Sequence, residues 1–264
     1  MKLAEALGAR FGDAPETAED ETLAPLAGRG SCRAFRREPL PSDLLRTLAG
    51  VALSAPSKSD LQLRDIVVLT KGAARDRLDA VAGFDWLPIA PAMFVFIANI
   101  ARHDAVHEQA GVPKANEHFD LSFNAFVDAG VALGYCVAAA ELIGLGACPL
   151  SVIRNQPEEV AAALKLPDRT APVAGLALGW PERPPRIQPR LGLDATVHEG
   201  ALGEPDAGIT DYDARRGWPG RRRDSDRFGD KADYGWSDDK ARQYADPQRE
   251  DWGAFLRARG FPMG

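Results

Sequence analysis

The sequence predicts a folded protein in which short strands alternate with helices around an apolar core. First, 45% of its 264 residues are hydrophobic and 27% are charged, which is typical of a globular chain and excludes a disordered or collagen-like one. Second, several short apolar runs have the length of buried strands. Third, the segments between these runs carry apolar residues at helical spacing.

The first half of the chain begins with an extension. A short amphipathic piece over residues 3–11 and an acidic stretch over 13–21 predict an N-terminal extension over residues 1–25. A helix is predicted over 42–53, and it must end before Pro56, because the residue before a proline avoids the helical region. The elements predicted next are a strand over 65–70, a helix over 71–82 and a strand over 92–98 that is apolar on both faces.

The second half continues the alternation and then changes in composition. Residues 102–118 are polar and contain glycine and proline, so we expect a loop or a covering segment there. The elements predicted next are a long helix over 120–143 that is rich in small residues and a strand over 147–153. They are followed by a helix that begins at Pro157 and ends before Pro167, and by a strand over 171–178. Residues 204–251 combine charges of both signs with tryptophans, which predicts an arm with short helices rather than a disordered tail.

Composition also excludes several classes of protein. A net charge of −6 disfavours nonspecific binding to nucleic acid or to an anionic membrane. The most apolar stretches, 86–101 and 125–146, are interrupted by prolines or charges, so we expect buried core or subunit interface rather than membrane spans. The N-terminus lacks the features of a signal peptide, and three scattered cysteines form no disulfide framework, so we expect a cytoplasmic protein. No glycine-rich nucleotide-binding motif of the Rossmann or P-loop type occurs.

Three polar segments could carry binding chemistry. The turn Arg29-Gly30-Ser31-Cys32-Arg33 combines two arginines with a hydroxyl, which suits a phosphate, although it also fits an ordinary surface turn. Residues 55–62 offer hydroxyls, a carboxylate and an amide that can hydrogen-bond a heterocycle, or they form a plain polar loop. The proline-rich segment 184–190 holds Arg190 at a fixed angle, or it is a charged linker.

These segments occur in the order found in the FMN-dependent nitroreductase superfamily. Residues 28–62, with R-x-S-x-R-x-F, a helix and A-P-S-x-x-(N/D)-x-Q, resemble the opening of that family. The second half is similar in Gly144-Leu145-Gly146, Leu164-Lys165-Leu166-Pro167, the run 175–181 and Pro189-Arg190-Leu191. The ending, with Tyr212-Asp213, Trp236-Ser237-Asp238 and Phe255-Leu256, resembles the subgroup of larger NADPH-preferring nitroreductases and flavin reductases.

The resemblance implies a fold, an assembly and a reaction. The fold would be α+β, with three layers in which helices flank a central, mostly antiparallel sheet, and two chains would interlock as a homodimer that holds FMN at its interface. Residues 26–200 would form the FMN-binding domain, and 201–264 a C-terminal arm packed on the body or on the partner subunit. In a ping-pong reaction, NADPH or NADH would reduce the flavin, which would then reduce a nitroaromatic, quinone or flavin acceptor without a nucleophilic or basic side chain.

The same resemblance implies the flavin contacts. The phosphate and ribityl contacts would be Arg29, Gly30, Ser31, Arg33 and Arg190. The contacts from the partner subunit would be Ser57, Ser59, Asp60 and Gln62, and the ring would be lined by Pro149, Leu150, Ser151 and Val152, with Gln188 nearby. Three of these residues depart from the family pattern: Gly30 replaces an arginine, Asp60 an asparagine and Gln188 a lysine. The last two changes disfavour negative charge on the reduced flavin.

The arm holds further candidates. By resemblance, the 2′-phosphate of NADPH would meet Arg215, Arg216, Arg221, Arg222 and Arg223, although Asp224 and Asp226 also allow a charge-balanced surface. His103 and His107, at i and i+4, could bind a metal on a helix, but Gly111-Val112-Pro113 nearby suggests a loop, so we predict no metal site; the other two histidines are His118 and His198. Two alternatives remain open: a reductase of another electron-poor substrate in the same family, and a flavin-binding module without turnover.

Overall fold

The computed structural model describes residues 1–12, 20–218, 220 and 222–264. These residues form two compact units. The larger unit contains Ser31–Pro185 and Arg249–Gly264, and the smaller unit contains Met1–Gly30 and Arg186–Gln248. Each unit therefore joins segments that are distant in the sequence.

The larger unit is built on a four-stranded antiparallel sheet with the order β1-β2-β4-β3. The strands are β1 (Arg64–Leu69), β2 (Ala92–Asn99), β3 (Gly146–Leu150) and β4 (Thr170–Gly179). β2 and β4 occupy the centre and are buried along nearly their whole length, as their continuous apolar sequences require. All four predicted strands are confirmed, although β3 ends earlier than expected and gives way to a 3-10 turn at Val152–Arg154.

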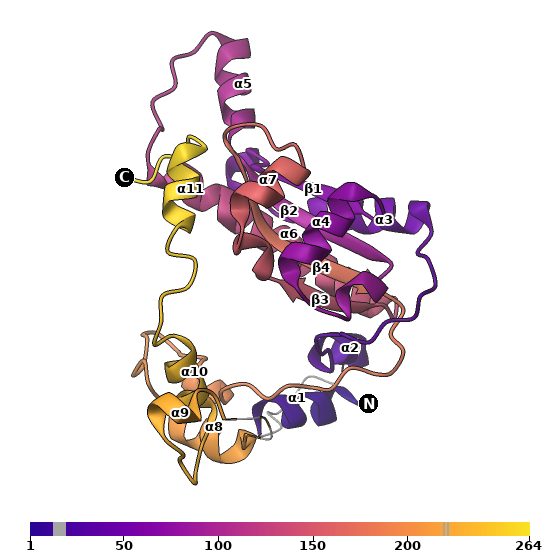
Figure 1. Ribbon diagram of the computed structural model, residues 1–264, viewed down its shortest axis with the longest axis vertical. Helices are drawn as coiled ribbons and strands as arrows, with labels where there is room; N and C mark the ends of the chain where they lie inside the picture. Colours follow the sequence, from indigo (N-terminus) through magenta and orange to yellow (C-terminus); the bar gives the residue numbers. More distant parts are fainter. Residues whose placement is uncertain (13–19, 219, 221) are drawn as a thin grey trace. The chain divides into compact units, whose positions relative to one another are not determined.

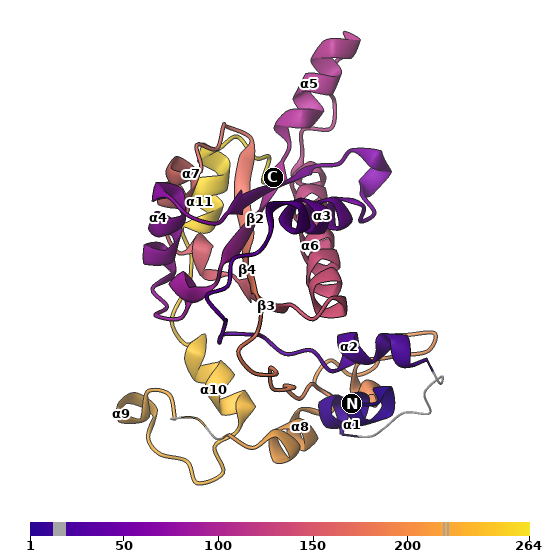
Figure 2. The same cartoon turned by 90° about the vertical axis from the view of Figure 1, so that its right-hand side faces the viewer.

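Helices cover both faces of this sheet (Figures 1 and 2). The helices of the unit are α3 (Ser42–Leu53), α4 (Ala73–Ala82), α5 (Ala101–Ala110), α6 (Phe119–Leu142), α7 (Pro157–Ala163) and α11 (Trp252–Ala258). Phe94 and Phe96 point toward α3 and α6, whereas Met93 and Val95 point toward α4 and α7. Alternate residues of one strand thus fill two cores, because successive side chains leave a strand on opposite faces. The three-layer α+β fold implied by the resemblance is confirmed.

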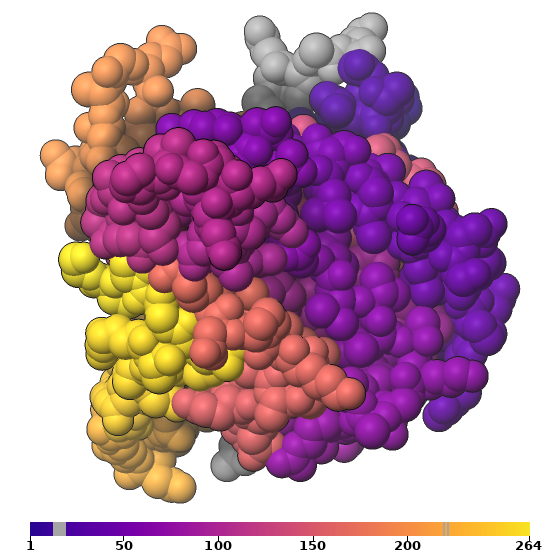
Figure 3. Space-filling model, turned by 90° about the horizontal axis from the view of Figure 1, so that it is seen from above, coloured from indigo at the N-terminus to yellow at the C-terminus, as the bar shows by residue number. Residues whose placement is uncertain are grey.

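The C-terminal helix α11 closes one end of the sheet. Phe255 and Leu256 are buried together with Leu63 of the segment that precedes β1. Arg259 donates to the carbonyl of Leu166 at 2.6 Å. Figure 3 shows the C-terminal segment, in yellow, against the salmon-coloured surface around α7. The end of the chain is therefore part of this unit.

Helix α6 is long and apolar enough, by length and composition, to cross a membrane. Its inner face, however, is packed on α3 and the sheet through small residues such as Ala129, Ala132 and Cys136. Asp128 is also buried on this helix. These contacts are those of a central helix in a folded unit, as its small residues predicted.

The prediction of a loop over residues 102–118 is wrong for its first part. Helix α5 begins near Asn99, whose Oδ1 accepts the Arg102 N–H at 3.3 Å, and ends at Gly111, which has a φ of 65°. Most side chains of α5 are polar or exposed, so no hydrophobic period marks the helix. The glycine and proline that indicated a loop lie just beyond its end.

The smaller unit consists of short helices joined by irregular segments. Its helices are α1 (Leu3–Phe11), α2 (Ala24–Ala27), α8 (Ile209–Arg216), α9 (Ser225–Phe228) and α10 (Trp236–Gln243). Tyr212 and Trp236 meet edge to face with ring centroids 5.2 Å apart, and Asp213 accepts the Ser237 N–H at 3.0 Å. The charged, tryptophan-containing segment therefore contains short helices, as predicted. Residues 13–19 of the predicted acidic stretch lie outside the described residues.

Candidate functional site

The Ser31–Arg33 part of the arginine-serine motif lies beside β3. Ser31 forms a parallel bridge with Ala147, and the Cys32 N–H donates to the Ala147 carbonyl at 3.0 Å. The Cys32 side chain is buried, whereas those of Ser31 and Arg33 are partly and fully exposed. Arg33 is exposed and has no ion-pair partner among the residues that the structure describes. Its guanidinium can therefore meet an anionic ligand.

Two glycines permit this close approach to the sheet. A Cβ on Gly146 would lie 2.6 Å from Cys32 Sγ and 2.7 Å from Cys32 Cβ. A Cβ on Gly179, the residue paired with Gly146, would lie 2.5 Å from Pro91 Cδ and 3.0 Å from Phe35 Cδ1. Side-chain atoms do not approach so closely, because protein interiors are already close-packed. Glycine at these two positions therefore allows the motif to lie against the sheet.

The predicted ring-lining segment Pro149–Val152 lies where β3 ends. Pro149 and Ser151 are exposed, and Val152 begins a 3-10 turn. The Ser151 hydroxyl accepts a hydrogen bond from Arg249 at 3.3 Å, and Arg249 Nε donates to Asn155 Oδ1 at 2.7 Å. Arg249 thus places a second guanidinium in this part of the larger unit. No sequence pattern had singled it out.

The loop between α3 and β1 gathers the four residues expected to face the flavin of the partner subunit. Ser59, Asp60 and Gln62 have left-handed φ angles of 49°, 53° and 51°. Such a conformation costs a non-glycine residue roughly 1–2 kcal/mol. Ser57 Oγ accepts the Gln62 N–H at 3.2 Å, and Asp60 Oδ1 accepts from the Gln62 side-chain amide at 3.1 Å. The loop is therefore a compact, strained turn in which Asp60 engages the Gln62 amide.

In the smaller unit, Arg10 hydrogen-bonds the backbone of three other predicted flavin contacts. Its buried guanidinium donates to the carbonyl of Gln188 at 3.2 Å and to that of Arg29. The Arg190 N–H donates in turn to the Arg10 carbonyl at 2.7 Å. Arg10 was not predicted as a site residue. A signal was present, since it follows Leu3 by seven residues and so lies on the buried face of α1.

The structure gives the arginines of the arm different roles. Arg215 donates to the carbonyls of Arg10, at 3.3 Å, and of Arg190, so it supports the backbone there. Arg222 and Arg223 form ion pairs with acidic residues at 3.5 and 3.4 Å. Arg221 lies outside the described residues. These contacts leave Arg216 as the stronger candidate for a ligand phosphate in the described part of the arm.

Arg216 lines a hollow of about 490 Å³ within the smaller unit. The other lining residues include Phe11, Arg190, Tyr212 and Trp236. Arg216 donates to the Tyr212 hydroxyl at 2.6 Å, and its guanidinium lies 5.7 Å from the centroid of the Tyr212 ring. Two guanidinium groups beside aromatic rings suit a ligand that joins a phosphate to a planar ring.

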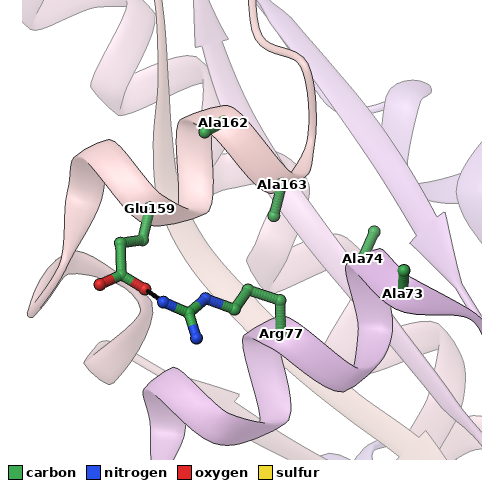
Figure 4. A pocket seen from close by; sticks show the side chains of 6 residues that line it. All are labelled: Ala73, Ala74, Arg77, Glu159, Ala162 and Ala163. Atoms are coloured by element: carbon green, nitrogen blue, oxygen red, sulfur yellow. Dashed lines mark hydrogen bonds and ion pairs between the residues drawn. The ribbon is translucent and has the colours of Figure 1, made fainter.

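A second hollow, of about 340 Å³, lies between α4 and α7 in the larger unit (Figure 4). Its lining residues are Ala73, Ala74, Arg77, Glu159, Ala162 and Ala163. Arg77 forms an ion pair with Glu159, so this cation is already neutralised. The lining contains none of the predicted flavin contacts, and we assign no cofactor to it.

A charged cluster surrounds His103 at the start of α5. Potential ligand atoms of His103, Asp104 and Glu117 lie within 4.8 Å of one another. Lys114 and Arg169 form ion pairs with both carboxylates at distances that include 2.7, 2.8 and 2.9 Å. The negative charge that a metal ion would require is therefore already balanced. Burial lowers the pKa of His103, which favours its neutral form. The absence of a metal site stays a prediction.

Comparison with known proteins gives two matches to family models. The model of the nitroreductase family matches residues 26–180. The model of the C-terminal domain of the nitroreductase family matches residues 188–264. Together these two models span most of the chain.

Curated relatives and solved structures agree with these models. The NADPH-flavin oxidoreductase of Vibrio harveyi is 30% identical over 182 residues, which are 68% of this chain and 74% of that protein. The oxygen-insensitive NADPH nitroreductase of Salmonella typhimurium is 33% identical over 179 residues, covering 67% of this chain and 73% of that protein. The structure of NfrA2 from B. megaterium has a TM-score of 0.82 at 27% identity and covers 93% of this chain and 99% of its own.

A further solved structure is the Vibrio harveyi NADPH:FMN oxidoreductase complexed with NAD+. It has a TM-score of 0.77 at 27% identity, covering 91% of this chain and 98% of its own. The family models, the relatives and the three-layer fold point to the same conclusion. The chain belongs to the nitroreductase family.

Proposed function

We propose that this protein is an FMN-dependent NAD(P)H oxidoreductase that reduces nitroaromatic, quinone or flavin acceptors by a ping-pong mechanism. Family membership supports the activity, since curated relatives include an NADPH-flavin oxidoreductase and an NADPH nitroreductase. The structural observation that carries the proposal is the position of Ser31 and Arg33 beside β3, whose end bears the predicted ring-lining segment.

The donor set of each unit fits a flavin mononucleotide. In the larger unit, Arg33 is an exposed cation without an ion-pair partner among the described residues, and Ser31 lies next to it. In the smaller unit, Arg10 holds the backbone of Arg29 close to that of Gln188 and Arg190. Guanidinium and hydroxyl groups are the usual partners of a flavin phosphate, because their hydrogen bonds to it are charge-assisted. We propose Arg29, Ser31, Arg33 and Arg190 as the phosphate and ribityl contacts.

FMN supplies the two-electron redox chemistry when bound, and the chain's own residues bind and orient it. Ser57, Ser59 and Gln62 would hold the cofactor by hydrogen bonds from the partner subunit. The carboxylate of Asp60 in the same loop would oppose negative charge on a nearby ring. A reduced flavin that is destabilised in this way is a stronger reductant, which leaves open the alternative within the family, a reductase of another electron-poor substrate.

The outer face of α6 supports a homodimer. Phe123, Val127 and Tyr135 are 51%, 43% and 44% exposed on this face. A Cβ on Gly130 or Gly134 of the same helix would meet no atom within 4 Å. An exposed apolar face with small residues suits close packing of a second helix, and a second copy of this chain offers the same face. We therefore propose that two copies pack through α6.

The dimer is tested by placing a charge on this face. Val127→Glu should convert the dimer to a monomer in light scattering after gel filtration, and it should also release FMN. Val106→Glu is the matched control, since Val106 of α5 is also apolar and is 55% exposed. A Val127→Glu protein that remains dimeric and yellow would contradict the proposed interface.

Arg216 is proposed to recognise the 2′-phosphate that NADPH carries and NADH lacks. Arg216→Ala should raise the KM for NADPH about tenfold while leaving that for NADH unchanged, as expected for the loss of one charge-assisted hydrogen bond. Arg222→Ala, at an arginine already paired with Asp230, is the control. Equal effects on both nucleotides would remove Arg216 from this role.

The function is tested by the colour of the purified protein and its response to nucleotide. We expect a yellow protein with one FMN per chain that is bleached under anaerobic conditions by NADPH or NADH and reoxidised by acceptors from a panel. A yellow protein inert to both nucleotides would instead support the flavin-binding module. Arg33→Ala and Arg190→Ala should each lower FMN affinity about 10- to 100-fold. Arg37→Ala, an exposed arginine on the same segment as Arg33, should not.

Three further expectations stay predictions. They are the cytoplasmic location, the absence of nucleic-acid and membrane partners, and the division into an extension over 1–25, an FMN-binding domain over 26–200 and an arm over 201–264.

A further inference from the structure

A buried ion pair holds the loop that joins α3 to β1. Arg64 and Asp128 lie 3.4 Å apart, and their side chains are 4% and 3% exposed. Asp128 Oδ1 accepts the Lys58 N–H, and Asp128 Oδ2 accepts the Leu63 N–H, both at 3.1 Å. One carboxylate therefore ties the middle of the loop to its end.

Arg64 holds the beginning of the same loop. Its Nη2 donates to the carbonyls of Leu53, at 2.9 Å, and Ala55, at 2.6 Å. Between these anchors Ser59 and Asp60 keep left-handed backbone conformations. Such conformations persist only where surrounding contacts impose them. The ion pair supplies contacts of this kind on both sides of the strained residues.

Core stability alone does not require this arrangement. Two buried charges lose their hydration, and a well-packed apolar pair of similar volume is often equally stable. The backbone groups bonded by the Arg64–Asp128 pair all belong to the loop or to its ends. In another ion pair, Arg75–Asp79, the buried Arg75 instead donates to backbone carbonyls near residues 87–90, away from the predicted site.

We propose that Arg64 and Asp128 are positioning residues of the flavin site. They hold the loop in the shape that presents Ser57, Ser59 and Gln62 to the flavin. The inference rests on the proposed function, in which this loop faces the flavin. Both residues act through the loop backbone, and Asp128 lies on α6, the helix that carries the proposed dimer face.

The test replaces the ion pair by apolar residues in the full-length protein. R64M/D128L removes both charges together and leaves no unpaired buried charge, so the protein should still fold, with a urea midpoint lowered only by the loss of the backbone hydrogen bonds. The Lys58 and Leu63 N–H groups lose their carboxylate acceptor, so the loop should no longer be held in the shape that presents its side chains to the flavin. The affinity of the apoprotein for FMN should therefore fall about tenfold or more, as for one or two lost hydrogen bonds. The flavin midpoint potential should shift as well. The matched control R75M/D79L should change neither flavin property.

Asp128→Asn provides a second variant if the double replacement does not fold. Its amide nitrogen cannot accept one of the two backbone hydrogen bonds, so hydrogen exchange of residues 57–63 should accelerate and FMN affinity should fall. A stable R64M/D128L protein with wild-type FMN affinity and potential overturns the inference, as does Asp128→Asn with unchanged exchange and affinity. A wild-type protein that binds no FMN overturns the proposed function itself, so the two failures are distinguishable.

Discussion

Replacing Gly146 by alanine tests the packing that brings the arginine-serine motif onto β3. The new Cβ would lie 2.6 Å from Cys32 Sγ, 2.7 Å from Cys32 Cβ and 3.3 Å from Phe35 Cε1. Cys32 is 3% exposed and its backbone N–H is bonded to the Ala147 carbonyl, so its Cβ cannot move away without displacing the backbone. Overpacking of this kind costs about 1–3 kcal/mol. Because the strain is relieved by displacing residues 31–33, FMN affinity should fall together with stability.

The assay is urea unfolding combined with titration of the apoprotein with FMN. Gly50→Ala is the control, since a Cβ there meets no atom within 4 Å and the position lies inside α3. The same substitution at Gly50 should stabilise the protein by about 0.5–1 kcal/mol. In C32G/G146A both clashing atoms of Cys32 are absent, so the two effects should be strongly non-additive. A G146A protein with wild-type stability and FMN affinity would refute the packing argument.

Three further predictions concern buried groups. Burial raises the pKa of the Cys136 thiol from 9.0 to about 12. Between these pH values the unfolded chain loses the thiol proton and the folded protein keeps it, so the free energy of unfolding should fall faster with pH in the wild type than in C136A. The difference should reach at most about 1.4 kcal/mol per pH unit in urea unfolding. Desolvation lowers the pKa of His103, so below about pH 6.5 the unfolded chain takes up a proton that the folded protein does not, and stability falls. Between neutral and acidic pH, the free energy of unfolding should therefore fall less for H103F than for the wild type. Arg10→Met removes the donor to the Gln188 and Arg29 carbonyls, so FMN affinity should fall about tenfold. Arg37→Met is the control and should leave FMN affinity unchanged. An Arg10→Met protein with wild-type FMN affinity would contradict the role of Arg10.

The layers of the larger unit could be predicted from local pattern. Continuous apolar runs at residues 92–98 and 171–178 indicated strands buried on both faces, and β2 and β4 occupy the centre of the sheet. The small residues of 120–143 indicated a central helix, which is α6. Such elements can be predicted because neighbouring residues report which faces are buried. Helix α5 was not predicted, because its residues are largely polar or exposed and it has no apolar stripe at helical spacing.

The order of motifs was enough to place the chain in its family and to nominate residues for the cofactor. Only the tertiary structure shows which of these predicted residues lie close to one another. Arg10 bonds Arg29 and Gln188, and Asp128 anchors a loop that precedes it by about 65 residues. In the sequence Asp128 is only a charge interrupting an apolar stretch. Its partners are distant along the chain, and the burial that makes its hydrogen bonds effective exists only once α3, β1 and α6 have packed together.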